Sequence, residues 1–193
     1  RIELIAKIQS SQNINNLNVE DADVIGLFRL GNEVCIQVFF IRSYENRGNH
    51  AFFPKTGGGA EDIEIIENFL AQFYSTKIPA REILLSYPLR NNEVLLNFLT
   101  ERKKSKVMIR SPSKGRVKDL IKTAENNAKE ALERKIAMKA SQKSLFDEVE
   151  TWLKLKKKIK KIEVYDNSHI QGSFPIGCLV AINLEGYSKS DYR

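Results

Sequence analysis

Apolar positions between residues 22 and 53 form short runs that are rich in β-branched and aromatic side chains. The runs cover 24–30, 34–44 and about 49–53, and the turn residues Gly31-Asn32-Glu33 separate the first two. Runs of this kind joined by short polar turns are typical of strands that follow one another in a meander. The sequence therefore predicts three consecutive strands.

The spacing of apolar residues then changes to a helical one. Apolar residues recur every three or four positions through 60–74 and again through 93–100, whereas 82–87 and 106–110 are short apolar runs. This pattern predicts two helices that alternate with two further strands. The resulting order of three strands, helix, strand, helix, strand and helix predicts an α/β fold of the ribonuclease H-like type, a mixed sheet with flanking helices.

The last third of the chain predicts a long helix followed by a second sheet. Helical spacing continues from about 116 to 155, with an expected break near Ser141-Gln142-Lys143-Ser144, and strands are expected at 162–166 and 176–184. Asp166 would then end the first of these strands, just before a tight loop. We expect four parts: a helical segment 1–16, a ribonuclease H-like domain 17–113, a helical connector 114–160, and at 161–193 the first hairpin of a second ribonuclease H-like domain.

Composition narrows the class of protein. The 193 residues are 42% hydrophobic, which is enough for a real core, and the formal charge of +7 favours an anionic partner such as nucleic acid, although many basic domains bind none. No apolar run approaches the roughly 20 residues that cross a bilayer. Arg1 does not begin a signal peptide, so we expect a cytoplasmic protein cut from a longer one.

Cys35 and Cys178 lack the spacing of a zinc site or a redox motif, and we expect both to be buried thiols.

Two segments near the end of the chain carry a specific resemblance. Asp-Asn-Ser-His-Ile-Gln-Gly at 166–172 and Lys-Ser-Asp-Tyr-Arg at 189–193 resemble the nuclease half of the UvrC family, a component of the bacterial ABC excinuclease. Segments 21–26, 69–74 and 126–132 are also similar to that family. The resemblance therefore spans the whole chain, and its last part is the most specific.

The resemblance implies a role in nucleotide excision repair and the SOS response. The family acts with UvrB on damaged DNA and makes incisions on both sides of a lesion. Residues 1–16 would be the end of the UvrB-docking motif, most of which would lie before Arg1. Asp166 would be a catalytic residue and a ligand of Mg²⁺ or Mn²⁺, and the family's other catalytic residues would follow Arg193. This piece alone is therefore expected to lack cleavage activity.

Other interpretations of the site residues stay open. Asp166 could instead cap a turn, and His169 could contact phosphate or water around the site or only order its loop. Gly57-Gly58-Gly59 could cradle an anion or form a flexible connection. The alternative function is a non-catalytic DNA-binding or scaffold module with a ribonuclease H-like fold.

The acidic residues of the first domain do not follow the pattern of a nuclease. Asp21 and Asp23 precede the first strand, and Glu64 or Glu67 could add a carboxylate from the first helix. The fourth strand offers only Glu82, at the wrong end. We therefore expect a degenerate, non-catalytic copy of the fold.

Two basic clusters flank the approach to Asp166. Lysine and arginine contact phosphates without regard to sequence, although such runs often only solvate a surface. The expected DNA-binding residues are Lys103, Lys104, Arg110, Lys114 and Arg116 in the first cluster and Lys156, Lys157, Lys158 and Lys160 in the second.

Overall fold

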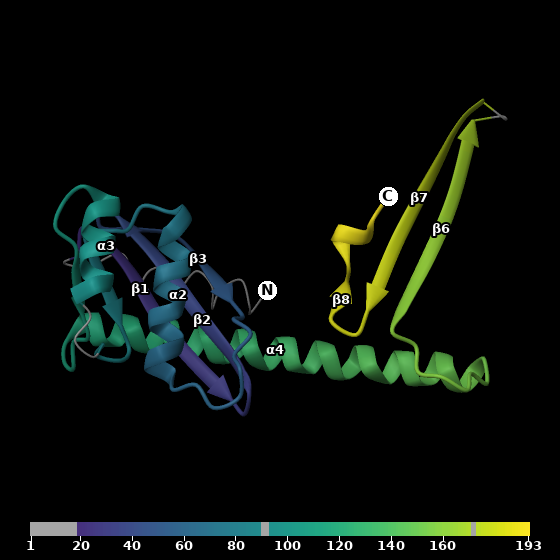
Figure 1. Ribbon diagram of the computed structural model, residues 1–193, viewed down its shortest axis with the longest axis horizontal. Coiled ribbons are helices and arrows are strands. Elements are labelled where there is room, and N and C mark those ends of the chain that lie inside the picture. The colour runs from purple at the N-terminus through teal and green to yellow at the C-terminus, as the bar shows by residue number, and fades with distance from the viewer. Residues whose placement is uncertain (1–18, 90–92, 171–172) are drawn as a thin grey trace, which may run out of the picture. The chain divides into compact units, whose positions relative to one another are not determined.

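The computed structural model describes residues 19–89, 93–170 and 173–193, and the side chains of 169 and 170 lie outside the described part. The segment 1–16, expected to be the end of a docking motif, also lies outside the described residues. The chain divides into two compact units, 1–132 and 133–193 (Figure 1). Each unit is described by itself.

The first unit has the element order that the sequence predicts, and the α/β class is confirmed. The chain forms β1 (Asp21–Leu30), β2 (Glu33–Arg42), β3 (Glu45–Phe52), α2 (Asp62–Thr76), β4 (Glu82–Leu85), α3 (Glu93–Lys103), β5 (Met108–Arg110) and the start of α4 (Arg116–Trp152). The five strands form one sheet in the order β3-β2-β1-β4-β5. The three meander strands pair antiparallel, whereas β4 pairs parallel with both β1 and β5. This mixed sheet is consistent with a ribonuclease H-like domain.

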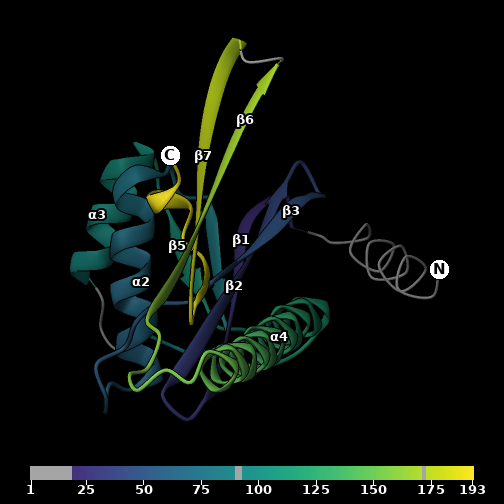
Figure 2. The same ribbon diagram turned by 90° about the vertical axis from the view of Figure 1, so that its right-hand side faces the viewer.

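The two-residue period of β1 sends its side chains into two separate cores. Ile25 and Leu27 pack against α2 and α3 on one face, whereas Ala22 and Val24 belong to the cluster that α4 covers on the other. Figure 2 shows α4 on the face of the sheet opposite to α2 and α3. The first unit is therefore a three-layer structure with the sheet in the middle.

Gly26 lets α4 approach the sheet closely. A Cβ atom at this position would lie 2.5 Å from the carbonyl carbon of Ala124 and 2.9 Å from the Ala124 Cβ. Ala124 and Ala128 are fully buried, so small side chains line the contact on both sides. The absent Cβ of Gly26 and these small alanines set the spacing between the helix and the sheet.

Helix α4 is more regular than expected. It runs without interruption from Arg116 to Trp152, so the predicted break at 141–144 is wrong. The segment contains no proline or glycine, and serine, glutamine and lysine are tolerated inside a helix at small cost. Buried Leu120 and Ile121 pack on the sheet, so the first half of the segment that we expected as a connector belongs to the core of the first unit.

The second unit contains the end of α4 and a three-stranded antiparallel sheet. Its strands are β6 (Lys161–Ile170), β7 (Ser173–Asn183) and β8 (Gly186–Tyr187), followed by a 3₁₀ turn at Lys189–Asp191. The backbone of Arg193 also bonds to that of Leu179, with N–O distances of 2.8 and 3.3 Å. The C-terminal residue is thereby held against β7.

The two cysteines differ in their surroundings. Cys35 is buried in β2, as predicted, whereas Cys178 is exposed on β7, so the expectation of a buried thiol is wrong there. The described residues of the second unit supply no layer that covers this position. Among the described helices, none is both long and apolar enough to span a membrane.

We predict that Gly26→Ala destabilises the first unit by about 1–3 kcal/mol, because the new methyl group meets the backbone of α4 and one element must shift. Gly57→Ala is the matched control, since a Cβ at Gly57 meets no atom within 4 Å. Urea unfolding of both variants measures the difference. Equal stabilities of the two variants would show that the packing of α4 on the sheet does not depend on the missing side chain of Gly26.

Candidate functional site

Asp166 lies in the middle of β6 and not at its end. It is paired with Cys178 of β7, and the ladder continues to the pair of Ile170 with Ser173 after a register irregularity. The expectation that the strand ends at Asp166 is therefore wrong, because β7 pairs with three further residues, Asn167, Ser168 and Ile170. A carboxylate inside a strand also does not cap a turn, so that alternative is excluded.

The carboxylate of Asp166 stands on an open sheet face. Directly paired residues of an antiparallel ladder share a face, so Asp166 lies beside Val164, Cys178 and Ile176. Val164 is 56% exposed and Ile176 is 69% exposed. On the same face of β7, Ile176 and Cys178 are exposed, whereas Val180 is half-buried.

The described residues do not assemble a metal site around Asp166. Two-metal hydrolysis needs several converging carboxylates, and the described residues contain no group of three or more His, Cys, Asp or Glu side chains that could hold an ion. The side chain of His169 lies outside the described part, so its expected role stays a prediction. One exposed carboxylate by itself does not fit a pair of Mg²⁺ or Mn²⁺ ions.

Of the four candidate lysines just before β6, one is paired with carboxylates of α4 and three are not. Lys158 Nζ lies 2.7 Å from Asp147 Oδ1 and 2.8 Å from Glu150 Oε2, and both carboxylates belong to α4. Hydrogen bonds to these two carboxylates raise the pKa of Lys158. Glu150 also accepts a hydrogen bond of 2.7 Å from the Ile159 amide. Lys158 therefore fastens the segment to the helix.

The other three lysines of this segment are available to an anion. Lys156, Lys157 and Lys160 are exposed, and within the described residues none of them forms an ion pair. The second basic cluster thus presents three free ammonium groups on a short connection between α4 and β6.

The first basic cluster is also divided. Lys103 is only 19% exposed and is paired with Asp21, whereas Arg110 pairs with Glu82 at 3.0 Å. Lys104, Lys114 and Arg116 are exposed. Lys103 is therefore a structural residue, and the exposed members of this cluster remain candidates for phosphate contact.

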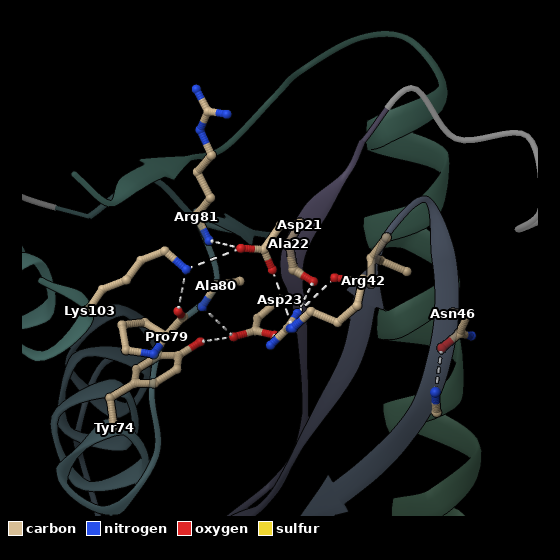
Figure 3. Close-up of polar contacts among 12 residues, drawn as sticks. Asp21, Ala22, Asp23, Arg42, Asn46, Tyr74, Pro79, Ala80, Arg81 and Lys103 are labelled. Carbon is tan, nitrogen blue, oxygen red and sulfur yellow. Dashed lines mark hydrogen bonds and ion pairs between the residues drawn. The ribbon is translucent and has the colours of Figure 1, made fainter. Parts of the chain in front are cut away.

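The acids at the start of β1 belong to a partly buried polar network (Figure 3). Asp23 is 1% exposed, and its Oδ2 accepts hydrogen bonds from the Tyr74 hydroxyl at 2.7 Å and from the Ala80 amide at 3.2 Å. Arg42 Nη2 lies 2.8 Å from Oδ1 as an ion pair, without the alignment of a hydrogen bond. The carboxylate is thus held from three sides.

Asp21 continues the network toward α3. The Arg81 amide donates to its Oδ2 at 2.9 Å, and Lys103 Nζ lies 3.1 Å from the same oxygen. Lys103 also donates to the Pro79 carbonyl at 3.0 Å, and Arg42 Nε lies 3.3 Å from Asp21 Oδ1. Two cations and a backbone amide therefore surround this carboxylate.

The same contacts fix the protonation states. Burial alone would raise the pKa of Asp21, but the Arg81 and Lys103 hydrogen bonds and the charges of Arg42 and Lys103 hold that pKa below its ordinary value. Burial, together with the charge and hydrogen bond of Asp23, raises the pKa of Tyr74 well above its ordinary value. Tyr74 therefore stays a donor at neutral pH.

The acids of α2 and β4 do not join this network. Glu64 and Glu67 precede Tyr74 on α2 by ten and seven residues, which places them about 15 and 10 Å away along the helix axis. Glu82 is instead paired with Arg110. The carboxylates that could have built a nuclease centre in the first unit are therefore dispersed or neutralised by cations.

The helix that follows the triple glycine, α2, begins with acidic side chains. Asp62 and Glu64 lie in the first turn of α2, and Arg29 Nη1 lies 3.2 Å from Asp62 Oδ1. Two carboxylates at this end would repel a phosphate. The geometry favours the interpretation of 57–59 as a connection.

Arg42 and Tyr74 were not predicted as members of this network. The hairpin register gives a signal for Arg42, because the two-residue turn at Gly31-Asn32 places it directly opposite Asp21. No such local signal exists for Tyr74, which lies 51 residues from its partner Asp23.

Family models match most of the chain in two parts. Residues 21–135 match the model described as UvrC Ribonuclease H-like domain, and residues 150–193 match the model described as UvrC RNAse H endonuclease domain. The first match covers the β1 to β5 sheet and the first half of α4, and the second covers the hairpin that carries Asp166.

Curated relatives match over all 193 residues. UvrABC system protein C of Cereibacter sphaeroides is 45% identical, and the proteins of the same name from Paramagnetospirillum magneticum and Jannaschia sp. are 42% and 41% identical. The match covers 100% of this chain and 31% of each of the three relatives, so the chain spans about a third of their length. The two family models and these identities show that the chain belongs to the UvrC family.

Proposed function

We propose that this chain is the central region of a UvrC endonuclease that incises damaged DNA on both sides of a lesion, together with UvrB, in nucleotide excision repair in the cytoplasm. Its first unit serves as a non-catalytic scaffold. Its second unit contributes the strand that carries Asp166. The observation that supports this division of roles most directly is the neutralised Asp21 and Asp23 network, compared with the open Asp166 carboxylate.

In this proposal Asp166 is one ligand of a Mg²⁺ or Mn²⁺ site in the longer protein. Its position on an exposed sheet face leaves the carboxylate accessible to further ligands. The described residues form no group of three or more His, Cys, Asp or Glu side chains that could hold an ion, so we expect the chain by itself to be inactive as a nuclease. We also propose that the free lysines bind the DNA backbone without regard to sequence, as an enzyme that must tolerate any sequence requires.

The stability of Asp23→Ala distinguishes a structural carboxylate from a catalytic one. The change leaves the Tyr74 hydroxyl and the Ala80 amide without their acceptor, at about 1–3 kcal/mol for each group. We expect the free energy of unfolding to fall by at least about 2 kcal/mol. The matched control Glu64→Ala, at an exposed site, should change it by less than about 0.5 kcal/mol. Stabilisation by Asp23→Ala would instead indicate a strained, functional carboxylate.

Acid titration tests the role of Asp21. Its pKa is lowered in the folded protein, so its contribution to stability is present above the unfolded value near 3.9 and is lost as the pH falls through the folded value. We predict that wild-type protein is more stable than Asp21→Asn at pH 7, and that the difference shrinks below about pH 4. Denaturant unfolding at several pH values measures it, and a constant difference would exclude the ion-pair role.

DNA binding as a function of salt tests the lysine assignment. Replacing Lys156, Lys157 and Lys160 with alanine should weaken duplex binding and reduce the slope of log affinity against log salt by about 0.9 for each phosphate that is no longer bound. Lys158→Ala is the matched comparison, because its ammonium is already paired with two carboxylates of α4 and should change the slope little.

Asp166→Ala is the second control in that experiment and should leave the affinity unchanged. Flat, weak binding by the wild-type chain would contradict the docking role and favour a structural spacer. Metal-dependent cleavage of damaged duplex that disappears in Asp166→Ala would contradict the expected inactivity of this chain.

A further inference from the structure

The edge of the first sheet contains a pocket with an unusual lining. A cavity of about 340 Å³ lies where strand β3 meets the end of α2, and the side chains of Phe40, Arg47, Asn49, His50, Phe52 and Lys77 line it. Three of these residues are basic and two are phenylalanines, and the lining of the pocket contains no acid. A pocket of this volume falls at the small end of the range that holds small ligands.

The aromatic wall of the pocket continues into the core and is therefore rigid. The Phe52 ring lies 5.2 Å from Phe69 and 5.3 Å from Phe73 between centroids, and both of these residues are buried. Phe52 itself is only partly buried and packs against that cluster. His50 meets Phe52 edge to face at 4.7 Å, with its own side chain exposed. The sheet edge thus presents a fixed aromatic surface.

A cation is already positioned at this surface. Lys77 Nζ lies 4.2 Å from the centroid of Phe73 and 5.6 and 5.7 Å from those of Phe52 and Phe40. Lys77 is exposed at the C-cap of α2, so the rings hold its ammonium group without removing it from solvent. The ammonium is therefore oriented before any ligand arrives.

The strand beside the pocket is irregular, and the irregularity exposes a second cation. The pairing of β2 with β3 shifts between Phe39 and Ile41, and Gly48 has a φ of 125° and donates to Asn46 Oδ1 at 2.9 Å. Bulges of this kind redirect side chains at sheet edges. Arg47 lies between Asn46 and Gly48, and within the described residues its one ion pair is with exposed Glu45 at 3.1 Å, a contact that contributes little and exchanges readily.

We propose that this pocket binds an unpaired nucleotide of single-stranded DNA, with the base stacked against Phe52, beside the His50 ring that meets Phe52 edge to face, and the flanking phosphates bound by Lys77 and Arg47. Aromatic surfaces next to basic groups are the usual way in which single strands are held without sequence preference. Bases inside a duplex are stacked on one another and do not reach such a wall. This inference rests on the proposed function, because it is the proposed function that makes DNA the expected ligand.

An acidic peptide would also be attracted to Arg47 and Lys77. Its carboxylates would use the two cations, but its side chains would gain little from the His50 and Phe52 surface. The combination of exposed aromatic rings with flanking cations therefore favours a nucleotide over a peptide.

The test uses the full chain and a short oligodeoxythymidine that contains one 2-aminopurine, whose fluorescence reports base stacking. We expect saturable fluorescence quenching by wild-type protein. Phe52→Leu keeps an apolar side chain against Phe69 and Phe73 but removes the ring, and should weaken binding about tenfold. Lys77→Gln should reduce the salt slope by about 0.7, the value for one phosphate contact on a single strand.

Lys122→Gln is the matched control, because Lys122 is exposed on α4, which covers the opposite face of the sheet, and both the affinity and the slope should stay unchanged. Thermal unfolding of each variant confirms that it is folded, and His50→Ala, at an exposed position, provides a second stacking variant if Phe52→Leu is unstable. Quenching that is absent, or that is equal in wild type and in the folded stacking variants, would overturn the proposal.

One competitor and one set of variants separate this inference from the proposed function. Equal competition by polyglutamate would show a general anion site and overturn the nucleotide assignment. Loss of duplex binding in the variant that lacks Lys156, Lys157 and Lys160, with quenching retained, would support both assignments. Duplex binding by the wild-type chain without any quenching would contradict this inference and leave the proposed function intact.

Discussion

The first unit depends on the buried carboxylate of Asp23. A carboxylate that is 1% exposed is tolerated only when its oxygens are paired, and its partners come from β2, α2 and the residues just before β4. The bond to Tyr74 spans 51 residues and the bond to Ala80 spans 57. One acid therefore joins segments that are distant in sequence, and it ties the end of α2 to the start of β1.

The same constraint decides what the first unit can do. Arg42 and Lys103 already pair with the carboxylates of Asp21 and Asp23, and the acids of α2 lie at least about two helical turns from Tyr74. Stability and catalysis thus compete for these carboxylates, and here the network uses them for stability. The second unit shows the opposite arrangement, since Asp166 is exposed and lies among apolar neighbours that leave its face open.

Much of the architecture could be predicted because local periodicity determines it. The alternation in β1 and β2 and the helical spacing in α2 and α4 gave the element order, and the two-residue turn at Gly31-Asn32 sets the β1–β2 register. The expected break in α4 was wrong because polar residues at 141–144 weaken a helix only slightly. The expected strand end at Asp166 was wrong because a paired partner in β7 overrides the turn preference of Asp-Asn-Ser.

The parts of the site that could not be predicted depend on contacts between distant segments. A run of lysines does not show that Lys158 and Lys103 are paired while Lys156 and Lys157 are free, since the carboxylate partners come from other elements. The pocket at β3 likewise needs Phe52 and Lys77 from two elements.

The claim that cations neutralise Asp21 and Asp23 is tested most directly by the broadening of backbone amide NMR signals on addition of Mn²⁺. We expect the signals of Ala22, Asp23 and Arg81 to persist at Mn²⁺ concentrations that broaden signals near exposed carboxylates. Selective early broadening at these three residues would contradict it, because the network would then bind metal.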